Sequence, residues 1–102
     1  MKNLFSAATL IAGLLTPIIV FGNDIKVGVI LGFTGPIESL TPDMAASAEL
    51  AFKEASDSGR LLDGGKIVPI RADSTCTDAA AASAAAERLI TSNAVVAIFG
   101  AD

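Results

Sequence analysis

The stretch from Ile25 to Pro36 (IKVGVILGFTGP) constrains the fold more than any other part of the chain. Residues 27–31 contain no polar side chain, and a strand that is apolar on both faces is typical of a parallel sheet with helices on both sides. One face carries Val27, Val29 and Leu31, and the other carries Gly28 and Ile30. Gly32 and Gly35 then free the backbone for a turn, and Pro36 ends strand pairing. In open α/β sheets, ligands bind at loops that follow the carboxyl ends of such strands.

The next segment has the signals of a helix that lies against this strand. Thr41-Pro42-Asp43 predicts a helix start with Thr41 as the cap, and Gly59 predicts its end. The expected apolar stripe consists of Met44, Ala48, Ala51, Phe52 and Ala55. On the opposite face, Glu49 and Lys53 have the spacing of a favourable ion pair.

A second strand is predicted over Lys66–Asp73, and Pro69 in its middle favours a position at the sheet edge. A second helix follows, with Thr75 or Thr77 as the predicted cap and Ser92-Asn93 as its end. Its sheet-facing residues are expected to be Ala82, Ala85, Ala86, Leu89 and Ile90. Residues 94–99 (AVVAIF) are predicted to form a third strand that is apolar on both faces. The fold class is therefore α/β: a partial parallel sheet, β-α-β-α-β, with the flavodoxin-like order 2-1-3.

The first 22 residues are predicted to be a secretory signal peptide. Lys2 is the only charged residue before Asp24, and the segment from Leu4 to Phe21 is almost wholly apolar. A retained membrane anchor is the alternative, because 18 apolar residues is about the minimum for a span. Without Lys2, six basic side chains face eleven acidic ones, a net charge near −5. This charge argues against nucleic acid as a partner.

Residue types limit the chemistry of the chain. It contains no histidine, so histidine-based catalysis and the usual zinc sites are excluded, and no metal or cofactor is expected. The glycines at 28, 32 and 35 do not have the G-x-G-x-x-G spacing of dinucleotide-binding enzymes, which remain a minor alternative. Asp73 could occupy the place of the ribose-binding acid of such enzymes, although a turn role fits it better. No nucleophile has a base nearby, and the chain is not expected to be an enzyme.

Four segments together resemble one family: 24–36, 43–59, 66–78 and 86–100. They are similar to the periplasmic leucine/isoleucine/valine-binding proteins, the type I solute-binding components of ABC transporters. Members have two α/β lobes joined by a hinge, so residues 23–102 are expected to be the incomplete start of the first lobe. The resemblance implies an exported protein, monomeric when full length, that captures a branched-chain amino acid or a related metabolite in the periplasm and delivers it to an inner-membrane permease. A ligand-sensing receptor domain on the same fold is the alternative.

The resemblance also implies where the ligand binds. Relatives hold it between the lobes, at the carboxyl ends of the first-lobe strands. The corresponding candidates are Ser39 and Leu40 in the first loop, with Gly100 and Asp102 after the third strand. Cys76 is the single cysteine; an odd cysteine in an exported protein suggests a partner elsewhere. In relatives a cysteine at this place joins one shortly after the third strand, which implies a disulfide partner beyond residue 102.

Overall fold

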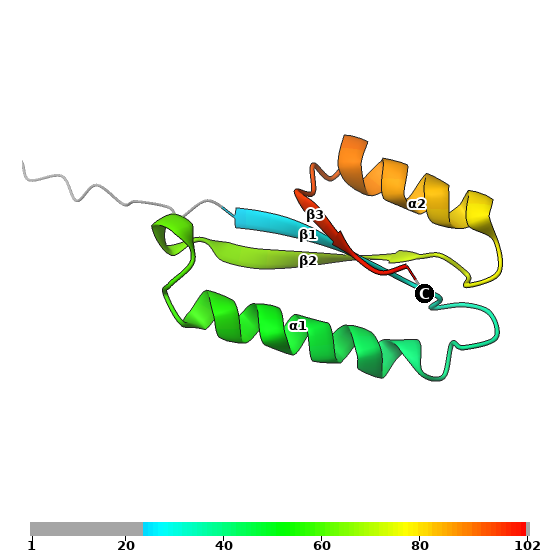
Figure 1. The fold of residues 1–102 in the computed structure, drawn as a ribbon, viewed down its shortest axis with the longest axis horizontal. Coiled ribbons are helices and arrows are strands. Elements are labelled where there is room, and N and C mark those ends of the chain that lie inside the picture. Colours follow the sequence, from blue (N-terminus) through cyan, green and yellow to red (C-terminus); the bar gives the residue numbers. More distant parts are fainter. Residues whose placement is uncertain (1–23, 102) are drawn as a thin grey trace, which may run out of the picture.

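The computed structural model describes residues 24–101, so the predicted signal peptide and Asp102 lie outside the described residues. The described chain forms a three-stranded parallel sheet with two helices, as predicted (Figure 1). The elements follow the order β1 (Asp24–Leu31), α1 (Thr41–Asp57), a 3-10 turn (Leu62–Gly64), β2 (Lys66–Asp73), α2 (Ala79–Thr91) and β3 (Ala97–Phe99).

The sheet has the strand order β2-β1-β3, which confirms the predicted topology. Every residue of β1 is in register with β2, from Asp24 opposite Lys66 to Leu31 opposite Asp73. The edge position of β2 among the described strands fits the proline at its centre. Because the chain steps from β1 to β2 and then back across β1 to β3, crossovers of one hand place α1 and α2 on opposite faces of the sheet (Figure 1).

The two faces of β1 pack into two separate apolar clusters, as the alternation predicted. On the α1 face, Val29 and Leu31 pack with Ala45, and Phe33 and Phe52 cover them. On the α2 face, a second cluster is formed by Ile30, Ala72, Ala85 and Leu89. Its partly buried neighbours include Ile70, Ala86, Val95 and Ile98. These clusters fix both helices against the central strand.

The buried stripe of α1 differs from the predicted one. Its buried positions are Thr41, Ala45 and Ser56, whereas Met44 is 43% exposed. Thr41 is not the cap: Leu40 occupies that position without a side-chain hydrogen bond, and the Thr41 hydroxyl donates to the Gly32 carbonyl at 2.9 Å. Two buried hydroxyl residues thus replace the expected apolar ones at the helix ends.

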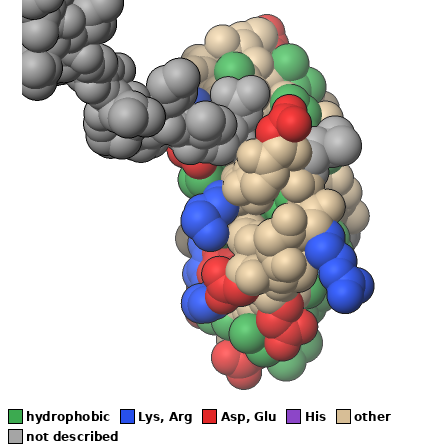
Figure 2. Space-filling view, turned by 90° about the vertical axis from the view of Figure 1, so that its left-hand side faces the viewer, with side chains coloured by type: hydrophobic (Ala, Val, Ile, Leu, Met, Phe, Trp, Pro, Cys, Tyr) green, Lys and Arg blue, Asp and Glu red, His purple; other side chains and the backbone are tan. Residues whose placement is uncertain are grey.

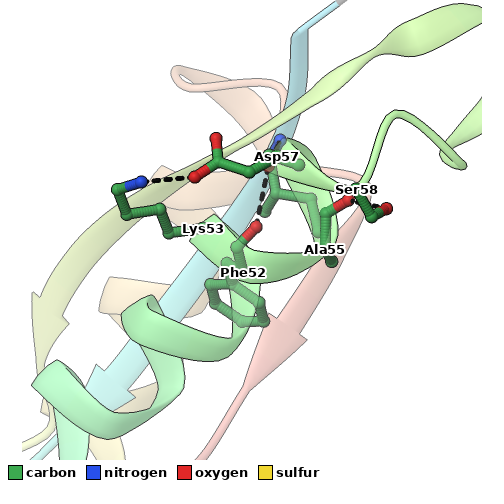
Figure 3. Close-up of polar contacts among 7 residues, drawn as sticks. Phe52, Lys53, Ala55, Asp57 and Ser58 are labelled. Carbon is green, nitrogen blue, oxygen red and sulfur yellow. Dashed lines mark hydrogen bonds and ion pairs between the residues drawn. The ribbon is translucent and has the colours of Figure 1, made fainter.

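The predicted ion pair between Glu49 and Lys53 is also wrong. Lys53 instead bonds Asp57, one turn further along, and Figure 3 shows the two side chains facing each other on the surface of α1. Near the helix end, the Ser58 hydroxyl donates to the Ala55 carbonyl at 2.6 Å (Figure 3). Glu49 turns towards the sheet, where it meets an arginine of β2.

The cap of α2 is Asp78, not Thr75 or Thr77. Its carboxylate accepts hydrogen bonds from the backbone N–H groups of Ala80 at 2.8 Å and Ala81 at 3.2 Å. Leu89 is buried as predicted, but Ile90 is 56% exposed.

The third strand is shorter than predicted and begins at Ala97. Ala94 has a positive φ of 54°, so the chain turns there before it joins the sheet. Val96 already donates to the Lys26 carbonyl at 2.9 Å but its side chain is 74% exposed. Phe99 is 44% exposed. Apolar surface of this segment therefore lies open in the described part of the chain.

Figure 2 shows the face of the molecule at the amino ends of the strands. Acidic and basic side chains are interspersed on it, and no large patch of one charge is visible. In the part of the chain that the structure describes, no helix is long and apolar enough to span a membrane.

Candidate functional site

The three strands end at the same edge of the sheet, and the loops that follow them define the candidate site. β1 ends at Leu31, β2 at Asp73 and β3 at Phe99. Figure 1 shows the loop before α1, the loop before α2 and the end of β3 at this carboxyl edge. Parallel strands with helices on both faces commonly bind ligands at this edge.

The loop between β1 and α1 is a compact series of turns. Phe33 donates its backbone N–H to the Leu31 carbonyl at 2.9 Å, and Leu40 donates to Ile37 at 2.9 Å. The buried Thr41 hydroxyl closes the loop by its bond to Gly32. These bonds tie the loop to itself near both ends.

Asp73, the last residue of β2, accepts hydrogen bonds from both neighbouring loops. One oxygen accepts from the Thr34 N–H at 3.2 Å and from the Thr75 N–H at 2.9 Å. The other oxygen accepts from the Thr34 hydroxyl. The Thr34 side chain, followed by backbone N–H groups, holds the pKa of Asp73 below its usual value, because each donor favours the charged carboxylate. Its predicted turn role is confirmed by the bond from Thr75.

The loop between β2 and α2 contains two consecutive residues in the left-handed region. Thr75 has φ 60° and Cys76 has φ 63°, a conformation that costs a non-glycine residue about 1–2 kcal/mol. Side chains just before them hold this backbone in place: Asp73 accepts from Thr75, and Ser74 Oγ accepts from the Cys76 N–H at 3.2 Å. Strained backbone that its neighbours hold in this way is a recognised mark of functional loops.

A hollow of about 300 Å³ opens beside this loop at the start of α2. It is lined by Ser74, Cys76, Thr77, Asp78, Ala79 and Ala82. Cys76 is a half-buried free thiol within the described residues. The carboxylate of Asp78 is already engaged by the first N–H groups of the helix.

A second set of contacts supports the first loop from the side of α1. Arg71 of β2 donates to both carboxylate oxygens of Glu49, at 2.6 and 2.9 Å. Its guanidinium lies over the ring of Phe33, 5.4 Å from the ring centre. The bond from Arg71 lowers the pKa of Glu49. Arg71 thus links the helix to the first residues of the loop.

Three of the four predicted site residues, Ser39, Leu40 and Gly100, lie in the described segments at the carboxyl edge. Ser39 and Leu40 are exposed just before α1, and the Leu40 side chain is 59% exposed. Gly100 lies against β1, where a Cβ would stand 1.9 Å from the Ile30 carbonyl oxygen, so no side chain fits. Asp102 lies outside the described residues.

Sequence reasoning missed the bond between Thr34 and Asp73, which joins residues 39 positions apart. The available signal was the acid at the last position of a strand, followed by two hydroxyl residues, Ser74 and Thr75. Within residues 24–101, no group of three potential metal-ligating side chains gathers in one place. The described edge presents backbone, hydroxyl groups, the carboxylates of Asp73 and Asp78, and the exposed side chain of Leu40.

The candidate site therefore lies at the carboxyl edge of a parallel sheet. Residues 24–102 match the family described as periplasmic binding protein. The chain belongs to this family. The membership confirms the resemblance and supports a solute-binding role in a family that is generally non-enzymatic and typically periplasmic. A search of curated proteins found no match.

Proposed function

We propose that this chain is part of an exported solute-binding protein that captures a branched-chain amino acid, or a related small metabolite, for an ABC transporter. The observation that carries the proposal is the carboxyl edge of a three-stranded parallel sheet, in a chain of the periplasmic binding protein family. In a two-lobed protein that closes about a hinge, this edge would form one wall of the cleft.

The chemistry of the edge suits a small zwitterion with an apolar side chain. The exposed Leu40 side chain offers an apolar contact, and the adjacent Ser39 hydroxyl can donate to a carboxylate. Gly100 follows β3 at the same edge and packs against the Ile30 carbonyl, so it could contact a ligand only through its backbone. In this proposal Asp102 stands at the rim and favours the ammonium group. Pockets of this kind combine apolar lining with a few polar groups that fix orientation.

Export and a disulfide are part of the same proposal. Residues 1–22 would be removed as a signal peptide, which places the mature protein in the periplasm, where disulfides persist. Cys76 would then pair with a cysteine outside the 102 residues. Closing a loop of 25–30 residues in this way would stabilise the protein by about 3 kcal/mol. Mass spectrometry of the periplasmic protein, alkylated with and without prior reduction, should find Cys76 unmodified until reduction.

The decisive experiment is a thermal-shift titration of the purified full-length gene product with each of the twenty amino acids and, separately, with NAD(H). A ligand at one hundred times its Kd stabilises the folded state by about 2.7 kcal/mol, which raises Tm by several degrees. We expect leucine, isoleucine or valine to give this shift and NAD(H) to give none. A protein that responds to NAD(H) and to no amino acid would refute the proposal. Uptake of labelled leucine by cells that lack the gene distinguishes transport from sensing.

A further inference from the structure

Hydrogen bonds to Asp73 connect the β1–α1 loop to the β2–α2 loop at the carboxyl edge. We call this connection of Thr34, Asp73 and Thr75 the joint. The Asp73 carboxylate accepts three hydrogen bonds: from the N–H and the hydroxyl of Thr34 in the first loop, and from the N–H of Thr75 in the second. Both oxygens are therefore used. Hydrogen bonds to an ionised acceptor are about twice as strong as neutral ones.

The close approach of the two loop backbones is an independent sign of the same joint. Gly35 has φ +102°, and a Cβ on it would lie 2.5 Å from the Thr75 carbonyl oxygen. Only glycine permits this approach. The sheet pairing also continues beyond the strands, since Ser74 donates its N–H to the Leu31 carbonyl at 3.0 Å.

The restraint that the joint places on Thr34 reaches the candidate ligand-binding residues, Ser39 and Leu40, through the turns of the β1–α1 loop. Glu38 donates to the Gly35 carbonyl at 3.3 Å, and Leu40 donates to the Ile37 carbonyl at 2.9 Å. These short-range bonds tie the loop into a compact unit, so a contact at Thr34 restrains the positions of Ser39 and Leu40. A loop that is ordered before binding loses less conformational entropy when the ligand arrives.

We propose that Asp73 is a positioning residue of the ligand site: it fixes the β1–α1 loop, and with it Ser39 and Leu40, against the β2–α2 loop. The inference rests on the proposed function, since it assigns a role within that site. Asp73 need not touch the ligand. Its effect on affinity comes from the order that it imposes on the loop.

The test uses the full-length gene product with Asp73→Ala, Asp73→Asn and, as a matched control, Asp63→Ala. Alanine removes all three bonds, whereas asparagine keeps an oxygen for the two N–H groups and can donate to the Thr34 hydroxyl, which then accepts. Asp63 is an exposed acid in the turn before β2, remote from the joint. Amide hydrogen exchange across residues 33–40 and calorimetric titration with leucine are measured on each variant.

We expect Asp73→Ala to raise exchange in residues 33–40 about tenfold and to weaken leucine binding to a similar extent, while exchange in α2 stays as in the wild type. Asp73→Asn should restore both to within about threefold, and Asp63→Ala should change neither. If Asp73→Ala does not fold, Thr34→Val, which removes only the hydroxyl bond, should raise exchange in the loop about threefold.

Unchanged exchange in residues 33–40 of Asp73→Ala, or of Thr34→Val where that variant replaces it, overturns the proposal. Faster exchange with unchanged leucine affinity overturns it as well, because the joint then orders a loop that does not set binding. A wild-type protein that binds no amino acid is a different result. It refutes the proposed function, while the exchange measurement still decides whether Asp73 holds the two loops together.

Discussion

The packing of Gly28 against Leu89 leads to a prediction of strong coupling between β1 and α2. A Cβ at Gly28 would lie 2.7 Å from Leu89 Cδ1 and 3.4 Å from Ile98 Cγ1. Leu89 is only 1% exposed and packs with Ile30 in the cluster beneath α2. A methyl group at position 28 therefore requires the end of the Leu89 side chain to move.

The two single substitutions should each destabilise the protein, for different reasons. Gly28→Ala overpacks the interface at a cost of about 1–3 kcal/mol, of which about 0.5–1 is offset because alanine suits a strand better than glycine. Leu89→Ala leaves a cavity and should cost about 2–5 kcal/mol. In the double variant the methyl group of Ala at position 28 enters the space that the leucine vacates. Its cost should therefore be about 1–3 kcal/mol less than the sum of the two single costs.

The assay is urea denaturation followed by circular dichroism, with an osmolyte present if the weakest variant is partly unfolded in water. Ile90→Ala is the matched control, because this neighbour is 56% exposed and its substitution should change the free energy of unfolding by about 0.5 kcal/mol or less. If the cost of the double variant equals the sum of the two single costs to within about 0.5 kcal/mol, the contact between Gly28 and Leu89 is refuted.

Three further predictions concern polar contacts, each read from the free energy of unfolding in urea. Asp78→Ala removes the cap of α2 and should cost about 0.5–2 kcal/mol, with Asp78→Asn retaining most of the stability. Thr41→Val removes the buried bond to the Gly32 carbonyl and should cost about 0.5–1.5 kcal/mol; no loss would argue against that bond. Glu49→Gln should cost under about 1 kcal/mol at neutral pH, because the pair with Arg71 is partly exposed. The folded-state pKa of Glu49 is lowered below 4.5, so this difference is present above that pH and is lost as pH falls through the folded value. A difference that persists at about pH 2 would contradict the ion pair.

The topology of the described sheet could be predicted because each element follows a rule that acts locally. An uninterrupted apolar strand before a glycine-containing loop indicated the buried centre, and β1 occupies that place. Pro69 lacks a backbone donor and therefore favoured the edge, where β2 lies. Neither inference needed to know which residues meet across the fold.

The faces of α1 could not be predicted from apolar periodicity, because polar residues define its buried stripe. The Thr41 hydroxyl donates to Gly32, and Ser56 Oγ donates to the Phe52 carbonyl at 2.7 Å while it accepts the Ile67 N–H at 2.9 Å. With these bonds made, both side chains can be buried at little cost. Apolar periodicity alone leaves Thr41 and Ser56 out of the buried face. It therefore assigns that face of α1 to the side that carries Met44.

The joint between the two loops has a non-local cause, and this explains why the sequence favoured a turn role for Asp73 and did not predict its bond to Thr34. One oxygen of Asp73 accepts from Thr75 in the local turn and from the Thr34 N–H, and the other accepts from the Thr34 hydroxyl. Thr34 comes close because Leu31 and Asp73 are in register at the ends of parallel strands. The predicted strand order already placed β2 beside β1, but it did not say which residues of the two strands lie opposite each other. A carboxylate at one strand exit, beside a hydroxyl residue shortly beyond the exit of its neighbour, can bond across the gap once the strands are aligned. Loop order at such an edge therefore depends on strand register as much as on the composition of the loops themselves.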